Sequence, residues 1–255
     1  MQRFQDKTVI VTGGGGGIGG ATSRRFAAEG AKVAVYDMNL AAAEKIAAGI
    51  RAAGGQAAAF QCDITDRTQV DAAVATTRAQ LGPVDVLVNN AGWDVFKPFV
   101  KTVPAEWEKL IAINLTGALH MLHAVLPGMA ERKYGRVVNV ASDAARGGSS
   151  GEAVYSACKG GLVALSKTLA REHARQGITV NVVCPGPTDT ALLAGVAEGA
   201  RDPAKLIEAF TRAIPLGRLG QGEDLASAIA FMGSDDASFV TGQVLSVSGG
   251  LTMHG

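Results

Sequence analysis

The sequence predicts one α/β domain, built on a doubly wound sheet of about seven parallel strands with helices on both faces. Short apolar runs alternate with helical segments throughout the 255 residues, which is the pattern of successive βαβ units. Glycine is in excess, at 33 residues against an average usage of about 7%, and it is concentrated at 13–20, 147–151 and 248–250. No linker, charge block or repeat divides the chain. We therefore expect a single Rossmann-type domain over residues 1–255.

The expected elements follow from apolar runs and helix boundary signals. Thr8–Thr12 is a continuous β-branched run, typical of a strand buried on both faces, and Gly30 can end a helix that starts at Ala21. Further strands are expected at Lys32–Asp37, Ala57–Gln61, Val84–Val88, Gly135–Ala141, Ile178–Val183 and Val244–Val247. Further helices are expected at Leu40–Ala53, Asp66–Leu81, within Pro104–Lys133, and at Glu152–Gln176, Pro203–Ala213 and Gly222–Gly233.

Composition excludes several classes of protein. Lys and Arg number 24 and Asp and Glu 23, a formal charge of +1, which argues against a nucleic-acid or anionic-membrane binder. No continuous apolar run approaches the ~18–20 residues that span a bilayer, and charges within Met1–Ile10 argue against a signal peptide. Cys62, Cys158 and Cys184 lack disulfide or zinc spacing. These observations predict a cytoplasmic protein without a metal site.

A glycine-rich loop, Gly13–Gly19, lies between the first expected strand and helix. Glycines let the backbone approach a pyrophosphate, whose charge the helix N-terminus stabilises; a flexible loop has a similar composition, but this context favours a nucleotide. Asp37 ends the second strand, 18 positions after Gly19. There it would accept hydrogen bonds from ribose hydroxyls and repel a 2′-phosphate, which favours NAD over NADP; an ordinary helix-start acid is the alternative. Asp63, before Ile64, could hold the adenine amino group.

Tyr155 and Lys159 are four residues apart, on one face of an expected helix. Such a pair is commonly part of a solvated surface. As a base near neutral pH, however, a tyrosine needs its pKa lowered by about 3 units, or about 4 kcal/mol. A cation about 4 Å away supplies about 4 kcal/mol at an effective dielectric near 20. The spacing thus predicts a tyrosine whose pKa Lys159 lowers enough for proton transfer.

These motifs and their order resemble the short-chain dehydrogenase/reductase family over the whole chain. Thr12-Gly13-x3-Gly17-x-Gly19, Asn89-Asn90-Ala91-Gly92 and Pro185-Gly186 match its cofactor segments, and Asn114, Ser142, Tyr155 and Lys159 match its catalytic tetrad. Together with the acids above, the resemblance implies a cofactor site of Gly13, Gly17, Ile18, Gly19, Asp37, Asp63, Ile64, Asn90, Ala91, Gly92, Tyr155, Lys159, Pro185, Gly186, Thr188 and Thr190.

The resemblance also implies a role for each member of the tetrad. Tyr155 takes the substrate hydroxyl proton in oxidation or gives it in reduction, and Lys159 lowers its pKa and binds the nicotinamide ribose. Ser142 holds the substrate oxygen, and Asn114 positions a water that links Lys159 to solvent. Members of the family are usually tetramers, so the apolar helices are expected to join four subunits. A buried helix of a monomer would look the same.

Substrate selection is expected in the segments that flank the tetrad, including a loop region at about 188–213. Trp93, Phe96 and Phe99 either form an apolar wall or pack within a lid. Asp143 and Arg146 either meet a polar part of the substrate or pair with each other. Arg201, Lys205 and Arg212 either contact the phosphates of a CoA tail or lie on a solvated helix face.

Three segments, Trp93–Phe99, Ser142–Arg146 and Cys184–Leu193, resemble the branch of the family that oxidises an alicyclic 2-hydroxyacyl-CoA to the 2-keto thioester with NAD. A 3-oxoacyl-thioester reductase, which usually takes NADP, and a general secondary-alcohol dehydrogenase are alternatives. A non-catalytic NAD-binding sensor is an alternative from another class, although the presence of both Tyr155 and Lys159 argues against it. His120 and His123, at i and i+3, lack a third ligand for a metal site.

Overall fold

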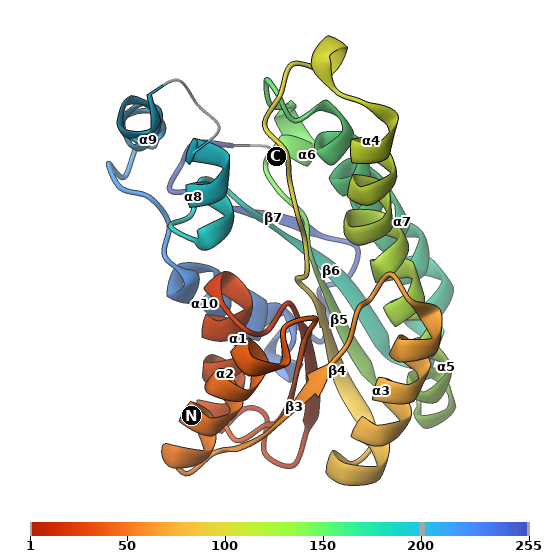
Figure 1. Cartoon of the computed structure of the whole chain (residues 1–255). Helices are drawn as coiled ribbons and strands as arrows, with labels where there is room; N and C mark the ends of the chain where they lie inside the picture. The colour runs from red at the N-terminus through yellow and green to blue at the C-terminus, as the bar shows by residue number, and fades with distance from the viewer. Residues whose placement is uncertain (1, 199–201, 254–255) are drawn as a thin grey trace.

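The computed structural model describes residues 2–198 and 202–253 and confirms the predicted fold class (Figure 1). Its sheet has seven parallel strands in the order β3-β2-β1-β4-β5-β6-β7. The strands are β1 (Thr8–Thr12), β2 (Lys32–Asp37), β3 (Gln56–Gln61), β4 (Val84–Asn89), β5 (Gly135–Val140), β6 (Ile178–Pro185) and β7 (Val244–Val247). The chain progresses outward in opposite directions from β1 and from β4, so the switch point of the sheet lies between these two strands.

Helices cover both faces of the sheet, with α1, α2 and α10 on one face and α3, α5 and α7 on the other (Figure 1). The helices are α1 (Gly17–Ala28), α2 (Leu40–Ala52), α3 (Arg67–Leu81), α4 (Pro104–Ile111), α5 (Gly117–Arg132), α6 (Ala144–Gly147), α7 (Ala153–His173), α8 (Ala191–Glu198), α9 (Pro203–Ala213) and α10 (Gly222–Met232). A π-helical segment, Ala112–Thr116, joins α4 to α5.

The start of α1 differs from the prediction, and the short helices α6 and α8 were not predicted. Helix α1 begins at Gly17, whereas the sequence placed its start at Ala21, because glycines that adopt helical torsions in the first turn had been assigned to the loop. Helix α8 lies in the segment after β6 for which the sequence predicted no regular element. Arg201, one of the predicted CoA contacts, lies outside the described residues.

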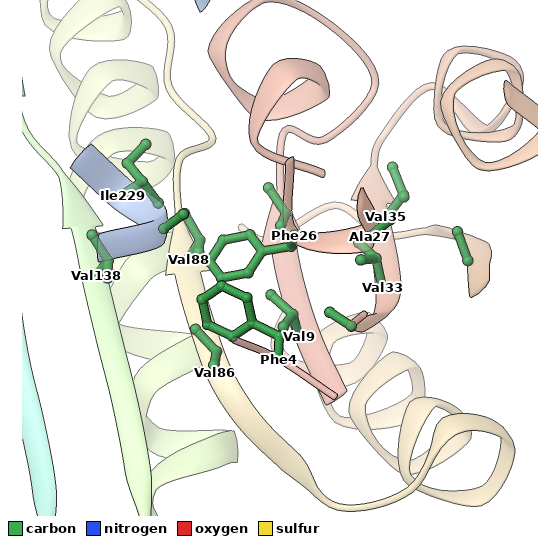
Figure 2. Packing of buried hydrophobic residues seen from close by; sticks show 14 of the residues in the cluster. Phe4, Val9, Phe26, Ala27, Val33, Val35, Val86, Val88, Val138 and Ile229 are labelled. Atoms are coloured by element: carbon green, nitrogen blue, oxygen red, sulfur yellow. The ribbon is translucent and has the colours of Figure 1, made fainter. Parts of the chain in front are cut away.

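Burial on both faces explains why the strands are continuous apolar runs. Along β1, Val9 and Val11 pack in the cluster beneath α1 and α10, and Ile10 packs in the cluster beneath α3 and α5. In the first cluster the Phe4 and Phe26 rings meet edge to face, with centroids 4.6 Å apart (Figure 2). Each fully buried side chain of this size contributes about 1.5–3 kcal/mol by leaving water, so the central strands form a rigid base for the loops at their ends.

One helical stretch, Pro104–Arg132, is long and apolar enough by length and composition to cross a membrane, among the residues that the structure describes. It comprises α4, the π-helical segment and α5, and 44% of its most apolar window is buried inside the fold. The expectation from continuous apolar runs overlooked it because polar residues such as Asn114, His120 and His123 interrupt the run. In this fold its α5 part packs against β4 and β5.

Candidate active site

The loops that carry the predicted cofactor residues meet at the carboxyl ends of β1 and β4, at the switch point of the sheet. Gly13 has a φ of +60°, a conformation that glycine adopts without strain. A Cβ atom at Gly19 would collide with the carbonyl oxygen of Gly13, and one at Gly15 would lie 2.8 Å from Asp37 Oδ2. The close turn therefore requires glycine and leaves the first turn of α1 open at its N-terminus, where Gly16 has nothing within 4 Å of a built Cβ.

Thr12 holds this glycine loop to the loop that follows β4. Its hydroxyl accepts hydrogen bonds from the N–H groups of Asn90, at 3.0 Å, and Ala91, at 3.1 Å, and donates to the carbonyl of Val88 at 3.3 Å. The Asn90 side chain donates in return to the carbonyls of Thr12 and Gly13, at 3.0 and 3.2 Å. The two loops therefore move as one unit.

Asp37 fits the predicted role at the ribose end of a dinucleotide. Its Oδ2 accepts the N–H of Gly15 at 3.0 Å and its Oδ1 accepts that of Asn39 at 2.9 Å, so the half-buried carboxylate is fixed beside the glycine loop. An anion there is compatible with ribose hydroxyls and repels a phosphate. The glycine cradle and this carboxylate together fit a dinucleotide with an unphosphorylated ribose.

The remaining predicted cofactor residues border the same opening. Asp63 is half-buried, and its Oδ1 accepts the N–H and hydroxyl of Thr65. The Ile64 side chain packs onto Gly117 of α5, and its carbonyl accepts a hydrogen bond from His120 Nδ1 at 2.9 Å. His120 is thus engaged in the fold, and among the described residues there is no group of three potential metal ligands.

The turn after β6 reaches back to helix α1. The Thr188 hydroxyl donates to the carbonyl of Gly186 at 2.9 Å, and the Thr190 hydroxyl donates to that of Thr188 at 3.3 Å. A Cβ at Gly17 would lie 3.3 Å from the Thr190 methyl group. Thr190 is therefore in contact with the first residue of α1, and the hydrogen bonds from Thr190 to Thr188 and from Thr188 to Gly186 link it to the end of β6. Lys205 and Arg212, on α9, are exposed.

Helix α7 carries Tyr155 and Lys159, which the structure brings together with Ser142 and Asn114. Tyr155 is buried, and the Ser142 side chain, two residues after the end of β5, is close enough to the Tyr155 hydroxyl to lower its pKa. Lys159 Nζ donates to the carbonyl of Val140 at 3.0 Å and lies 5.6 Å from the centre of the Tyr155 ring. A Cβ on Gly92 would be 3.0 Å from Asn114 Oδ1 and 3.4 Å from Lys159 Nζ, so all four side chains surround one small region.

Burial governs the titration of the catalytic pair in the chain alone. Burial raises the pKa of Tyr155 above its ordinary value, and the negative charges of Asp94 and Glu152 raise it further. Burial also lowers the pKa of Lys159 to about 8. The spacing to Lys159 predicted a lowered pKa for Tyr155, whereas in this structure its pKa is raised. The reason is that removing both groups from water favours their neutral forms.

Asn114 uses its side-chain amide to fix the loop after β4. Its Nδ2 donates to the carbonyls of Trp93, at 2.7 Å, and Leu110, at 3.0 Å, and its Oδ1 accepts the Trp93 N–H at 3.3 Å. It lies in the π-helical segment, a rare conformation that is frequent at functional sites. The water bridge from Asn114 to Lys159 that the resemblance implies stays a prediction.

An apolar cluster adjoins Tyr155 and includes Trp93. Leu110 and Ala144 are buried against Tyr155, with Trp93, Val95 and Val154 packed on them, and Lys109 Nζ lies 4.0 Å from the centre of the Trp93 ring. Phe96 instead packs on Gly151, and Phe99 stacks on Trp107 with ring centroids 5.6 Å apart. Of the three predicted aromatic residues, Trp93 lies beside the tetrad and the two phenylalanines pack among the loops.

Asp143 and Arg146 have side-chain contacts with β7, although they follow Ser142. The Ser246 hydroxyl donates to Asp143 Oδ1 at 2.5 Å, and Arg146 donates to Ser246 Oγ at 3.0 Å and to the Val244 carbonyl at 3.3 Å. Both charged side chains thus share Ser246 Oγ as a hydrogen-bond partner. These contacts give no support to a substrate role for either residue.

The sequence analysis did not identify two carboxyl groups near the tetrad, those of Asp94 and Glu152. Asp94 is buried and its carboxyl group is hydrogen-bonded to that of Glu152, and both affect the pKa of Tyr155. The available signals were their positions, two residues after the Asn89–Gly92 motif and three residues before Tyr155. Neither position carries a role in the motifs that the sequence analysis used, so only the fold shows that they meet.

Comparison with known proteins identifies the family. Residues 14–252 match the family model described as enoyl-(acyl carrier protein) reductase. The chain is 40% identical to acetoacetyl-CoA reductase of Shinella zoogloeoides over 247 residues, 96% of this chain and 98% of the relative. It is 36% identical to 3-oxoacyl-(acyl-carrier-protein) reductase of Escherichia coli K12 over 250 residues, 98% of this chain and 99% of the relative. The crystal structure of levodione reductase superimposes with a TM-score of 0.94 and 36% identity, covering 97% of this chain and 98% of that one.

The chain therefore belongs to the short-chain dehydrogenase/reductase family. It is an oxidoreductase of the class that acts on alcohol and keto groups with a nicotinamide cofactor.

Replacing Thr12 should separate the two cofactor loops. In Thr12→Val the buried N–H groups of Asn90 and Ala91 lose their acceptor, which should cost about 1–3 kcal/mol of unfolding free energy and weaken NADH binding by about 10-fold or more. Thr12→Ser keeps the hydroxyl and serves as the matched control. Urea unfolding and NADH fluorescence titration measure the two effects, and an unchanged affinity in Thr12→Val would contradict this account.

Proposed function

We propose that this protein is an NAD-dependent dehydrogenase of a secondary alcohol that lies β to a thioester, with 2-hydroxycyclohexanecarboxyl-CoA as substrate and 2-ketocyclohexanecarboxyl-CoA as product. The observation that carries the proposal is that Tyr155, with Ser142 near its hydroxyl, packs in the apolar cluster of Trp93, Leu110 and Val154. The hydroxyl of an alicyclic substrate matches the polar groups of Ser142 and Tyr155, and its ring matches the adjoining apolar side chains. The resemblance of Trp93–Phe99 and Cys184–Leu193 to dehydrogenases of this substrate supports the ring.

The substrates in the names of two relatives support a thioester group in the proposed substrate. The reductases from Shinella zoogloeoides and Escherichia coli are named for acetoacetyl-CoA and for 3-oxoacyl groups on acyl carrier protein. In both substrates, as in the proposed one, the reacting carbon is β to a thioester. A 3-oxoacyl-thioester reductase working in the opposite direction is therefore the second candidate, and the geometry of the tetrad serves both directions.

The tetrad performs the oxidation by moving one proton and holding one oxygen. Ser142 donates a hydrogen bond to the substrate oxygen and stabilises it as it becomes a carbonyl. Tyr155 Oη accepts the hydroxyl proton, and Lys159 favours the tyrosinate by its charge. A bound oxidised nicotinamide would supply the hydride acceptor for this oxidation and a positive charge near Tyr155. The glycine loop would hold the pyrophosphate, Asp37 the adenosine ribose and the Thr188–Thr190 turn the nicotinamide end.

The first test is a comparison of substrates. NADH formation from 2-hydroxycyclohexanecarboxyl-CoA should proceed with a kcat/KM at least ~100-fold higher than from 3-hydroxybutyryl-CoA or cyclohexanol, about 2.7 kcal/mol of transition-state discrimination. Each substrate is assayed with NAD and with NADP. Equal or better turnover of 3-hydroxybutyryl-CoA would refute the ring assignment and leave the oxidoreductase class intact.

Two tyrosine variants control this assay. Tyr155→Phe removes the proton acceptor and should lower kcat by about 10³-fold or more while leaving NADH affinity within a few-fold. Tyr134→Phe is the matched control, because the Tyr134 hydroxyl is bonded to Asp235 at the opposite end of the sheet.

The preference for NAD is a separate proposal that rests on Asp37. In Asp37→Ser the carboxylate that accepts ribose hydroxyls and repels a 2′-phosphate is lost. The ratio of kcat/KM for NAD to that for NADP should fall by at least about 10-fold. Glu44→Gln removes one exposed negative charge from α2 and should leave the ratio unchanged. A wild-type protein that already prefers NADP would overturn the assignment.

We also propose that the protein is a cytoplasmic homotetramer. A groove of about 480 Å³ runs between α5 and α7 and is lined mainly by Leu119, Leu122, Leu126, Leu165 and Leu169. Leu119 is 41% exposed, and a second copy of the groove would bury it. Sedimentation velocity should give a tetramer for the wild type and smaller species for Leu119→Asp. Leu40→Asp is the control, because the Leu40 side chain is exposed at the start of α2. A monomeric wild type would refute the assembly.

A further inference from the structure

We propose that Asp94 and Glu152 determine substrate specificity by excluding molecules with a free carboxylate next to the reacting carbinol and admitting neutral acyl derivatives such as thioesters. The inference rests on the proposed function only in that Tyr155 and Ser142 hold the reacting oxygen. It is carried by the juxtaposition of two carboxyl groups with the catalytic tyrosine. These groups come from the loop after β4 and from the residue preceding α7.

The two carboxyl groups contact each other beside Tyr155. Asp94 is 8% exposed, its Oδ1 accepts the N–H of Val95 at 2.7 Å, and its carboxyl group is hydrogen-bonded to that of Glu152. Glu152 is half-buried and occupies the N-cap position of α7, one turn before Tyr155, with no capping hydrogen bond from its side chain. Trp93 and Val95, the residues that flank Asp94, belong to the apolar cluster on Tyr155. The pair therefore lies on the same wall as the proposed substrate contacts.

The surrounding loops hold the pair in place. The N–H of Lys97 donates to the carbonyl of Gly151 at 2.8 Å, and the Phe96 ring lies against the Gly151 backbone, where a Cβ would meet it at 3.1 Å. On the other side of Asp94, the Asn114 amide binds both backbone polar groups of Trp93. The loop after β4 is thus tied at both ends of Asp94, so a substrate cannot displace the carboxyl groups at low cost.

The pair keeps one negative charge in a region with little water. Two carboxylates in hydrogen-bond contact repel each other, so the pair retains a shared proton and a single charge. Burial and the neighbouring Glu152 raise the pKa of Asp94. Of the cations among the described residues, Lys159 is the one whose charge acts on Asp94, and burial lowers its pKa to about 8. Trp93 and Val95, which flank Asp94, pack on Tyr155, and Glu152 is three residues before it at the start of α7, so the charge of the pair lies near the tyrosine and raises its pKa.

This electrostatic arrangement distinguishes two forms of the same acyl compound. In a β-hydroxyacyl substrate the acyl carbon is two bonds from the carbinol carbon, so it must lie close to Tyr155 when the hydroxyl is in place. A carboxylate there would meet the charge of the pair across a water-poor gap. A thioester carbonyl is neutral and can accept a hydrogen bond from the shared proton. The selection acts on the acyl charge and requires no recognition of CoA.

Ligand binding tests this selection without turnover. Cyclohexanecarboxamide and cyclohexanecarboxylate have nearly the same shape and differ in charge, and each is titrated into the enzyme–NADH complex by following NADH fluorescence. In the wild type the amide should bind about 100-fold more tightly than the carboxylate. In D94N/E152Q the two Kd values should agree within about 3-fold. Glu108→Gln, an exposed acid on α4, is the control and should keep the wild-type ratio.

The outcomes separate this inference from the proposed substrate. A wild-type ratio near one, a ratio that survives in D94N/E152Q, or failure of the amide to bind each overturns the inference. Thermal unfolding and NADH affinity of the double variant, and the single variant D94N, establish that the fold is intact. Oxidation of methyl 2-hydroxycyclohexanecarboxylate, its free acid and cyclohexanol is measured in parallel. If none is oxidised while the binding ratio behaves as expected, the alicyclic substrate is refuted and the charge selection stands.

Discussion

The hydroxyl of Thr12 is the contact on which the geometry of the site depends. It accepts two backbone N–H groups from the loop after β4 and thereby holds together the two segments that diverge at the switch point of the sheet. One segment leads to the glycine cradle and Asp37, and the other leads to Trp93, Asp94 and the Asn114 contact. A parallel sheet buried on both faces leaves its strand ends as the place where polar groups meet solvent and ligands. Thr12 determines how the two central ends are spaced.

Burial of ionisable side chains is the second constraint on the site, and the side chains involved come from distant parts of the chain. Tyr155 and Lys159 are both buried, so the cofactor-free chain favours neutral forms of both. The carboxyl groups of Asp94 and Glu152, which share one negative charge, reach the site from a loop about 60 residues before Tyr155 and from the start of α7. Burial and this charge both raise the pKa of Tyr155.

The sequence predicted the parts of this structure that depend on local pattern. Continuous β-branched runs located the strands because burial on both faces removes polar residues from them, and glycine spacing located the cofactor loop because a close turn excludes Cβ atoms. The pKa direction of Tyr155 could not be predicted, since burial and the carboxyl groups of Asp94 and Glu152 arise from tertiary packing. The contacts of Asp143 and Arg146 with β7 could not be predicted either, because the position of a residue after one strand does not indicate which neighbouring strand its side chain contacts. The helix start at Gly17 was missed because glycine is compatible with loop and helix alike.

The π-helical segment at Ala112–Thr116 allows the continuous helix formed by α4 and α5 to pack against two different parts of the fold. Each residue of an α-helix advances the side-chain direction by about 100°, so the wider turn changes the rotational phase between α4 and α5. With this phase, Leu110 is buried against Tyr155 while Met121, Val125 and Met129 are buried against the sheet. Removing a single residue from 112–116 would place the two halves out of phase, and either the wall of the pocket or the hydrophobic core would lose its side chains.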